Sequence, residues 1–86
     1  YYMKKLKITL KDANLIDQVF EKLVSKYSDL SPNTEDGVRI DFTEGWVHMR
    51  KSNTEPIVRI FSESDTQINA DKIALDIEKE INDLVN

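Results

Sequence analysis

The order of two hydrophobic periodicities along the chain is the feature that most constrains its fold. Apolar and polar residues alternate in residues 2–10, which is the pattern of a half-buried strand. Apolar residues then recur at helical spacing in residues 15–27, and three more alternating runs occupy residues 38–42, 46–51 and 57–63. A second helical pattern covers residues 66–85. The chain therefore predicts the order strand, helix, three or four strands, helix.

Both helical stretches are amphipathic, so each is expected to bury one apolar stripe. The first stripe consists of Leu15, Ile16, Val19, Phe20, Leu23, Val24 and Tyr27. The second stripe consists of Ala70, Ile73, Ala74, Ile77, Ile81, Leu84 and Val85, with Asp71, Lys72, Asp76, Glu78, Lys79 and Glu80 facing water. Asp12 or Asn14 is expected to cap the first helix, and Asp65, Thr66 or Asn69 the second.

Tight turns are expected between the later strands, at residues 35–37 (EDG) and 43–45 (TEG). Pro32 cannot donate to a β ladder, so any strand in residues 28–35 is short and lies at an edge. Antiparallel strands joined by tight turns need cover on one face, which two amphipathic helices supply. We therefore expect an α+β fold, a two-layer sandwich with an antiparallel sheet of about four or five strands and two helices on one face.

Length, charge and composition limit the classes of protein to which the chain can belong. The 86 residues are expected to form a single domain, residues 1–86. A formal net charge of -4 argues against broad nucleic-acid binding, and the absence of cysteine excludes disulfides and thiol nucleophiles. Because no apolar run approaches the length of a membrane span and no signal peptide opens the chain, we expect no membrane association and a cytoplasmic location. Tyr1, Tyr2 and Met3 are not a natural start, so we expect a fragment of a longer chain.

The connection at residues 50–56 (RKSNTEP) has a composition suited to capturing an anion. Arg50 offers a fork of donors that matches phosphate oxygens. Ser52 and Thr54 add hydroxyl groups, and Asn53 adds an amide together with a tolerance for left-handed backbone. The alternative is an ordinary surface turn, because polar residues near a proline are common in turns. In that alternative, the arginine would pair with a glutamate such as Glu55 or Glu63.

The loop and its surroundings resemble the C-terminal domain of the α-D-phosphohexomutases, which include phosphoglucomutase, phosphomannomutase and phosphoglucosamine mutase. The resemblance rests on RKSNTEP at residues 50–56, DGV at residues 36–38 and GWV at residues 45–47. It implies a fold similar to one repeat of the TATA-box-binding protein. It also implies that Arg50, Ser52, Asn53 and Thr54 bind the phosphate of a hexose phosphate that is not being transferred.

The resemblance further implies a part in a larger enzyme. The family's members are isomerases that move a phosphoryl group between O1 and O6 of the sugar through a hexose 1,6-bisphosphate. They use a phosphoserine and a magnesium ion held by other domains. This chain is therefore expected to carry no catalytic residue, metal ligand or cofactor, to work with other domains of the same polypeptide, and to be inactive alone. Sugar specificity is expected to lie outside it.

Other residues near the loop are weaker candidates for binding or catalysis. Lys51 and Arg59 are expected at most to support the positive potential around the phosphate. His48 has no evident carboxylate or nucleophile beside it, so a structural or solvated role is favoured over catalysis. An alternative function is a stand-alone α+β module that binds a macromolecule through the sheet face carrying Trp46, His48 and Phe61. Ile57 is expected on that same face.

Overall fold

The computed structural model describes residues 1–85 of the chain. The elements follow one another as β1 (Tyr2–Thr9), α1 (Asn14–Lys26), β2 (Val38–Asp41), β3 (Gly45–Lys51), β4 (Ile57–Ser64) and α2 (Gln67–Val85), with a short 3₁₀ turn at Ser28–Leu30 after α1. This order is the one that the hydrophobic periodicities predict. The second helix begins one residue after the expected position.

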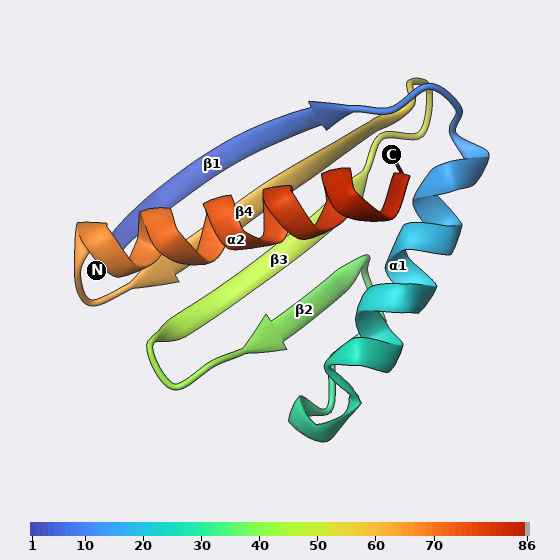
Figure 1. Cartoon of the computed structure of the whole chain (residues 1–86). Helices are drawn as coiled ribbons and strands as arrows, with labels where there is room; N and C mark the ends of the chain where they lie inside the picture. The colour runs from blue at the N-terminus through green and yellow to red at the C-terminus, as the bar shows by residue number, and fades with distance from the viewer. Residues whose placement is uncertain (86) are drawn as a thin grey trace.

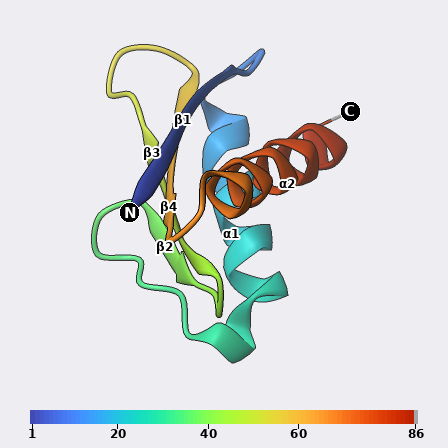
Figure 2. The same cartoon turned by 90° about the vertical axis from the view of Figure 1, so that its left-hand side faces the viewer.

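The four strands form one antiparallel sheet in the order β1-β4-β3-β2, so the first strand lies beside the last. Both helices pack on the same face of this sheet, as the edge-on view in Figure 2 shows, while the other face is left open. In Figure 1, α2 lies in front of the strands and contacts β1, β4 and β3, and α1 lies near the C-terminal end of α2. The α+β two-layer fold is confirmed, with four strands in residues 1–85.

The core lies between the sheet and the two helices. Inward-facing residues of the central strands, among them Val47, Met49, Val58 and Ile60, are fully buried. Ser62 is buried among them, and its hydroxyl donates a hydrogen bond to the backbone oxygen of Ala70 at 2.6 Å. The alternation of the strands therefore places every second residue of β3 and β4 on the open face.

Side chains expected as caps accept backbone hydrogen bonds at the start of both helices. The backbone N–H of Asn14 donates to Asp12 Oδ1 at 2.9 Å, and that of Asn69 donates to Thr66 Oγ1 at 3.1 Å. Thr66 caps α2, whereas Asp12 lies one residue before the N-cap position of α1, Ala13, which has no side-chain cap hydrogen bond. Asp12 and Thr66 each satisfy a backbone donor that the first helical turn leaves without a partner.

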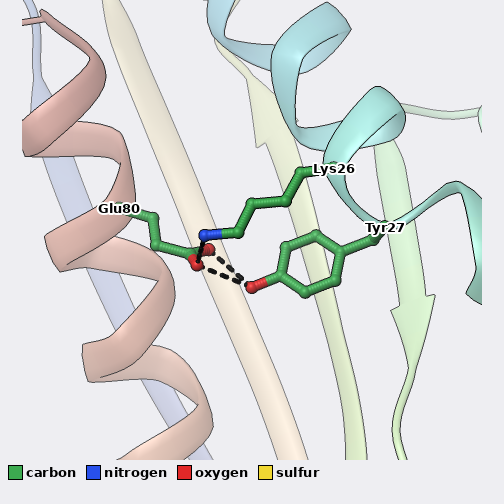
Figure 3. A network of polar contacts seen from close by, with 3 residues as sticks. All are labelled: Lys26, Tyr27 and Glu80. Atoms are coloured by element: carbon green, nitrogen blue, oxygen red, sulfur yellow. Dashed lines mark hydrogen bonds and ion pairs between the residues drawn. The ribbon is translucent and has the colours of Figure 1, made fainter.

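Two expectations about α2 are wrong. Leu84, expected in the buried stripe, is 37% exposed in the last helical turn. Glu80, expected to face water, accepts hydrogen bonds from the Tyr27 hydroxyl at 2.7 Å and pairs with Lys26 (Figure 3). Glu80 lies on the flank of α2 that faces α1, where periodicity within one helix cannot anticipate a neighbour. Burial, followed by the hydrogen bond to Glu80, raises the pKa of Tyr27 well above its usual value.

The two glycines both lie where a backbone approaches closely. Gly37 has φ +71°, and a Cβ there would lie 2.1 Å from the backbone oxygen of Met49. A Cβ on Gly45 would lie 2.1 Å from the backbone oxygen of Glu63. The turn at residues 35–37 therefore packs directly against the backbone of β3, next to Arg50. In the segment before this turn, Asn33 forms a single bridge with Arg39 at the sheet edge, as expected for a stretch that contains Pro32.

Within residues 1–85, no helix combines the length and the apolar character that crossing a membrane requires.

Candidate phosphate site

The connection between β3 and β4 lies at the same end of the sheet as the end of β1. The backbone N–H of Leu10 donates to the backbone oxygen of Pro56 at 2.7 Å, which joins the first strand to the loop. In Figure 1 this connection, coloured yellow, lies beside the tip of β1. Residues from β1, β3 and β4 therefore border the loop.

The loop is ordered by its own hydrogen bonds. The N–H of Ser52 donates to the oxygen of Ile57 at 3.0 Å, and the N–H of Ile57 donates to the oxygen of Glu55 at 2.8 Å. Ser52 is half-buried, and its Oγ accepts a 3.4 Å hydrogen bond from the N–H of Thr54. Because Oγ acts here as an acceptor, its own hydrogen remains available to donate to an anion.

The tip of the loop faces solvent. Asn53 and Thr54 are exposed, and within the described residues 1–85 the backbone N–H of Asn53 donates to no protein acceptor. The left-handed backbone that Asn53 tolerates is not used, because the positive φ values in the described part of the chain belong to Ser31 and Gly37. The loop closes through the hydrogen bonds of Ser52 and Ile57 instead.

Arg50 lies at the end of β3 on the open face of the sheet. Its Nε is 3.5 Å from Asp36 Oδ2, and both side chains are more than half exposed. The partner is therefore Asp36, and neither Glu55 nor Glu63 takes this role. His48 contacts the backbone oxygen of Asp36 through Nε2, so the turn before β2 is joined to β3 at two points.

Arg59 and Lys51, the two residues expected to support the site, lie on opposite faces of the sheet because side chains alternate along a strand. Arg59 lies directly across from Arg50 on β4, and both face away from the helices. Lys51 pairs with Val58, which belongs to the core, so it points to the helix side, where its Nζ is 3.0 Å from Asp17 Oδ1. The site therefore gathers Arg50, Arg59 and the loop tip, while Lys51 is directed toward α1.

The aromatic set on the open face is partly covered by the chain itself. Trp46, His48 and Phe61 are half-buried, and the Arg39 guanidinium lies 4.7 Å from the centre of the Trp46 ring. Ile57, which was expected with them on the face away from the helices, lies across from Thr9 and is only 7% exposed. It lies at the crowded junction where the loop meets the end of β1. The face is thus less apolar than the alternation of residues suggests.

The sequence analysis did not predict that Asp36 and Lys7 lie near this site. Asp36 reaches Arg50 because β2 pairs with β3, and Lys7 lies directly across from Arg59 because β1 pairs with β4. Alternation in residues 2–10 places Lys7 on the face opposite to Ile8, but it carries no information about which strand lies beside it.

Histidine and carboxylate side chains do not form a metal site in this region. Among residues 1–85, no group of three or more such side chains lies close enough together to hold a metal ion. The magnesium implied by the family resemblance therefore stays a prediction about the larger enzyme.

Residues 4–80 match the family described as phosphoglucomutase/phosphomannomutase, C-terminal domain. The chain belongs to this family. It is 35% identical over 81 residues to a phosphoglucosamine/phosphogalactosamine mutase of Sulfurisphaera tokodaii, a match that covers 92% of this chain and 18% of the relative. The resemblance carried by RKSNTEP and its surroundings is confirmed.

Further relatives carry related names. A phosphoglucosamine mutase of Methanococcus maripaludis is 38% identical over 76 residues, covering 85% of this chain and 17% of the relative. A phosphoglucomutase of Neisseria gonorrhoeae is 37% identical over 73 residues, covering 80% of this chain and 16% of the relative. The chain thus spans less than a fifth of the length of each of these three phosphomutases.

Proposed function

We propose that this chain is the C-terminal domain of a phosphohexomutase and binds the phosphate of a hexose phosphate that is not being transferred. The observation that carries the proposal is the convergence of Arg50, the Ser52 hydroxyl and the exposed loop tip at one end of the sheet, in a chain of this family. Arg59 lies directly across from Arg50 in the strand register and is exposed on the same face, which puts a second arginine next to the loop.

The chemistry of these groups matches a phosphate dianion. Arg50 offers parallel N–H donors that bind two phosphate oxygens, and the phosphate would take the position that the Asp36 carboxylate now competes for. Ser52 and Thr54 supply hydroxyl donors, Asn53 supplies its side-chain amide, and backbone N–H groups of the loop add further donors. A phosphate held this way is recognised by its charge and shape, so a phosphate on either O1 or O6 of the sugar fits equally well.

Holding one phosphate contributes to catalysis through position. In the larger enzyme, the sugar fixed at this loop would present its reacting oxygen to the nucleophile of another domain, which lowers the entropic part of the barrier. Magnesium in that other domain would neutralise charge on the phosphoryl group in transfer. The residues described here bind and orient, and they perform no bond-making step.

A titration followed by amide-resolved NMR tests the proposal. Adding glucose 1,6-bisphosphate should shift the amides of residues 50–54, with a Kd on the order of millimolar, because one phosphate held by a single loop gains about 4 kcal/mol. Unphosphorylated glucose should leave these amides unchanged, and sulfate serves as the control for simple anion binding.

Two matched variants sharpen this experiment. Arg50→Gln should weaken binding about tenfold or more, since it removes a charge-assisted bidentate contact. Arg39→Gln removes the same charge from the same sheet face beside Trp46 and should change binding less than about twofold. Equal effects of the two variants, or shifts spread away from the loop, would contradict a phosphate site at residues 50–54.

A further inference from the structure

Three cationic residues lie on adjacent strands of the open face, at the end of the sheet next to the loop. In the strand register, Lys7 of β1 is opposite Arg59 of β4, and Arg59 is opposite Arg50 of β3. All three side chains are exposed. We call Lys7, Arg59 and Arg50 the cationic row.

The cationic row is unusual because like charges placed directly opposite on neighbouring strands are destabilising. In the part of the chain that the structure describes, no carboxylate lies within ion-pair distance of Lys7 or Arg59, and Asp36 pairs with Arg50 alone. The next row along the sheet differs, since there Lys5 is opposite Phe61 and Phe61 is opposite His48. That row continues to Arg39 opposite His48, and Arg39 pairs with Asp41. Three cations on adjacent strands therefore occur in the row next to the loop.

The geometry lets the outer members of the row reach a common anion. Neighbouring strands are about 4.8 Å apart, so the backbones of Lys7 and Arg50 are separated by about 10 Å, with Arg59 between them. Lys7 carries its ammonium on a flexible four-carbon stem, and Arg50 carries a long side chain of its own. Both can bend toward Arg59 above the sheet. The hydrogen bond from Leu10 to Pro56 holds the end of β1 against the loop and keeps Lys7 within this range.

We infer that Lys7 is a further anion-binding residue, and that the site extends from the loop across three strands to receive a phosphomonoester dianion. The inference rests on the proposed function, since the ligand is the phosphate held at the loop. It adds a residue from the first strand, more than forty positions before the loop in the sequence. Lys7 supplies a mobile positive charge, while the two arginines supply directed hydrogen bonds.

The test compares Lys7→Gln with Lys5→Gln in the 86-residue chain, titrated with methyl phosphate and with glucose 1-phosphate at constant ionic strength. Lys5 is the matched control because it is exposed on the same strand and the same face, about 7 Å farther from the loop. Lys7→Gln should weaken binding of both ligands about fivefold, and Lys5→Gln less than about twofold. Lys7→Arg should retain binding within about twofold of the unaltered chain.

The outcomes separate this inference from the proposed function. Phosphate-induced shifts at residues 50–54 that are equally strong in Lys7→Gln would overturn the role of Lys7 and leave the loop site standing. Equal weakening by Lys7→Gln and Lys5→Gln would also overturn it, because only the general field of the face would then be acting. An unaltered chain that shows no shift at the loop with either ligand would overturn both proposals.

Discussion

Under the proposed function, a carboxylate of the chain and the phosphate of the ligand would compete for Arg50. Its Nε lies 3.5 Å from Asp36 Oδ2, and because both groups are exposed the ion pair contributes little to folding. The same carboxylate places a negative charge where the proposed phosphate would bind. The Arg50–Asp36 ion pair would therefore slightly stabilise the fold and would at the same time weaken binding of the proposed phosphate.

Replacing Asp36 with asparagine should strengthen phosphate binding about threefold, since the guanidinium no longer has to leave a carboxylate. The free energy of unfolding should change by less than about 1 kcal/mol, as is usual for an exposed pair. Titration with glucose 1-phosphate and thermal unfolding measure the two quantities. Asp41→Asn is the control, because Asp41 pairs with Arg39 in the same manner beside Trp46. Weaker binding in Asp36→Asn would show that Asp36 orients Arg50 for the ligand.

At this scale the sequence identifies candidate donors, but it does not identify the residues with which they pair. The loop composition identifies Arg50, Ser52, Asn53 and Thr54 as candidate donors, and strand alternation places Arg59 on the open face. The pairing with Asp36 depends on how β2 packs against β3, which no local pattern contains. The backbone of Asn53 is likewise set by hydrogen bonds within the closed loop, and its tolerance for left-handed conformations is not used.

At the scale of elements, the two helices are joined by a polar contact that their periodicities do not predict. A stripe of apolar residues tells which side of a helix is buried, and it says nothing about which residues of another helix lie beside its flank. Glu80 on α2 meets Lys26 and Tyr27 at the end of α1 because both helices cover the same face of the sheet (Figure 3). The Tyr27 ring also packs edge-on against Phe42, at 5.7 Å between ring centres, which joins this contact to the end of β2.

This contact should make stability depend on pH in the alkaline range. The folded chain raises the pKa of Tyr27, so its contribution is fully present below about pH 10, the usual tyrosine value, and is lost as pH rises toward the folded pKa. Denaturant unfolding between pH 8 and pH 11 should show a steeper loss of stability in the unaltered chain than in Tyr27→Phe. Tyr2→Phe alters an exposed tyrosine and should keep the steeper slope. Identical slopes in all three proteins would count against Tyr27, raised in pKa by burial and then by its hydrogen bond to Glu80, as the cause.

For the whole molecule, the proposed anion binding depends more on how charge is distributed over the surface than on the net charge. The net charge of -4 describes a chain whose second helix carries several carboxylates, while Lys7, Arg59 and Arg50 share one end of the open sheet face. The fold class follows from the periodicities, but the order β1-β4-β3-β2 does not, because alternation gives a strand two faces without naming its neighbours. The cationic row becomes visible only once that order is known.

A domain that only holds and orients a phosphate should not interconvert sugar phosphates. We expect the 86-residue chain to give no detectable conversion of glucose 1-phosphate to glucose 6-phosphate, even with magnesium and a trace of glucose 1,6-bisphosphate present. Phosphoryl transfer needs an in-line nucleophile together with neutralisation of the moving charge. Under the proposed function, this loop would supply only donors for the phosphate that is not transferred. A coupled assay that reports glucose 6-phosphate measures the rate, with the complete Neisseria gonorrhoeae phosphoglucomutase as the positive control.

Turnover that follows the chain through purification and disappears in Arg50→Gln would contradict a purely binding role. Turnover that is indifferent to Arg50→Gln would instead identify a contaminating enzyme. Under the proposed role, the chain binds glucose 1-phosphate through residues 50–54 and leaves it unchanged, so binding and turnover are separated in a single preparation. That separation is what a domain covering less than a fifth of its relatives should display if positioning and chemistry lie in different parts of the enzyme.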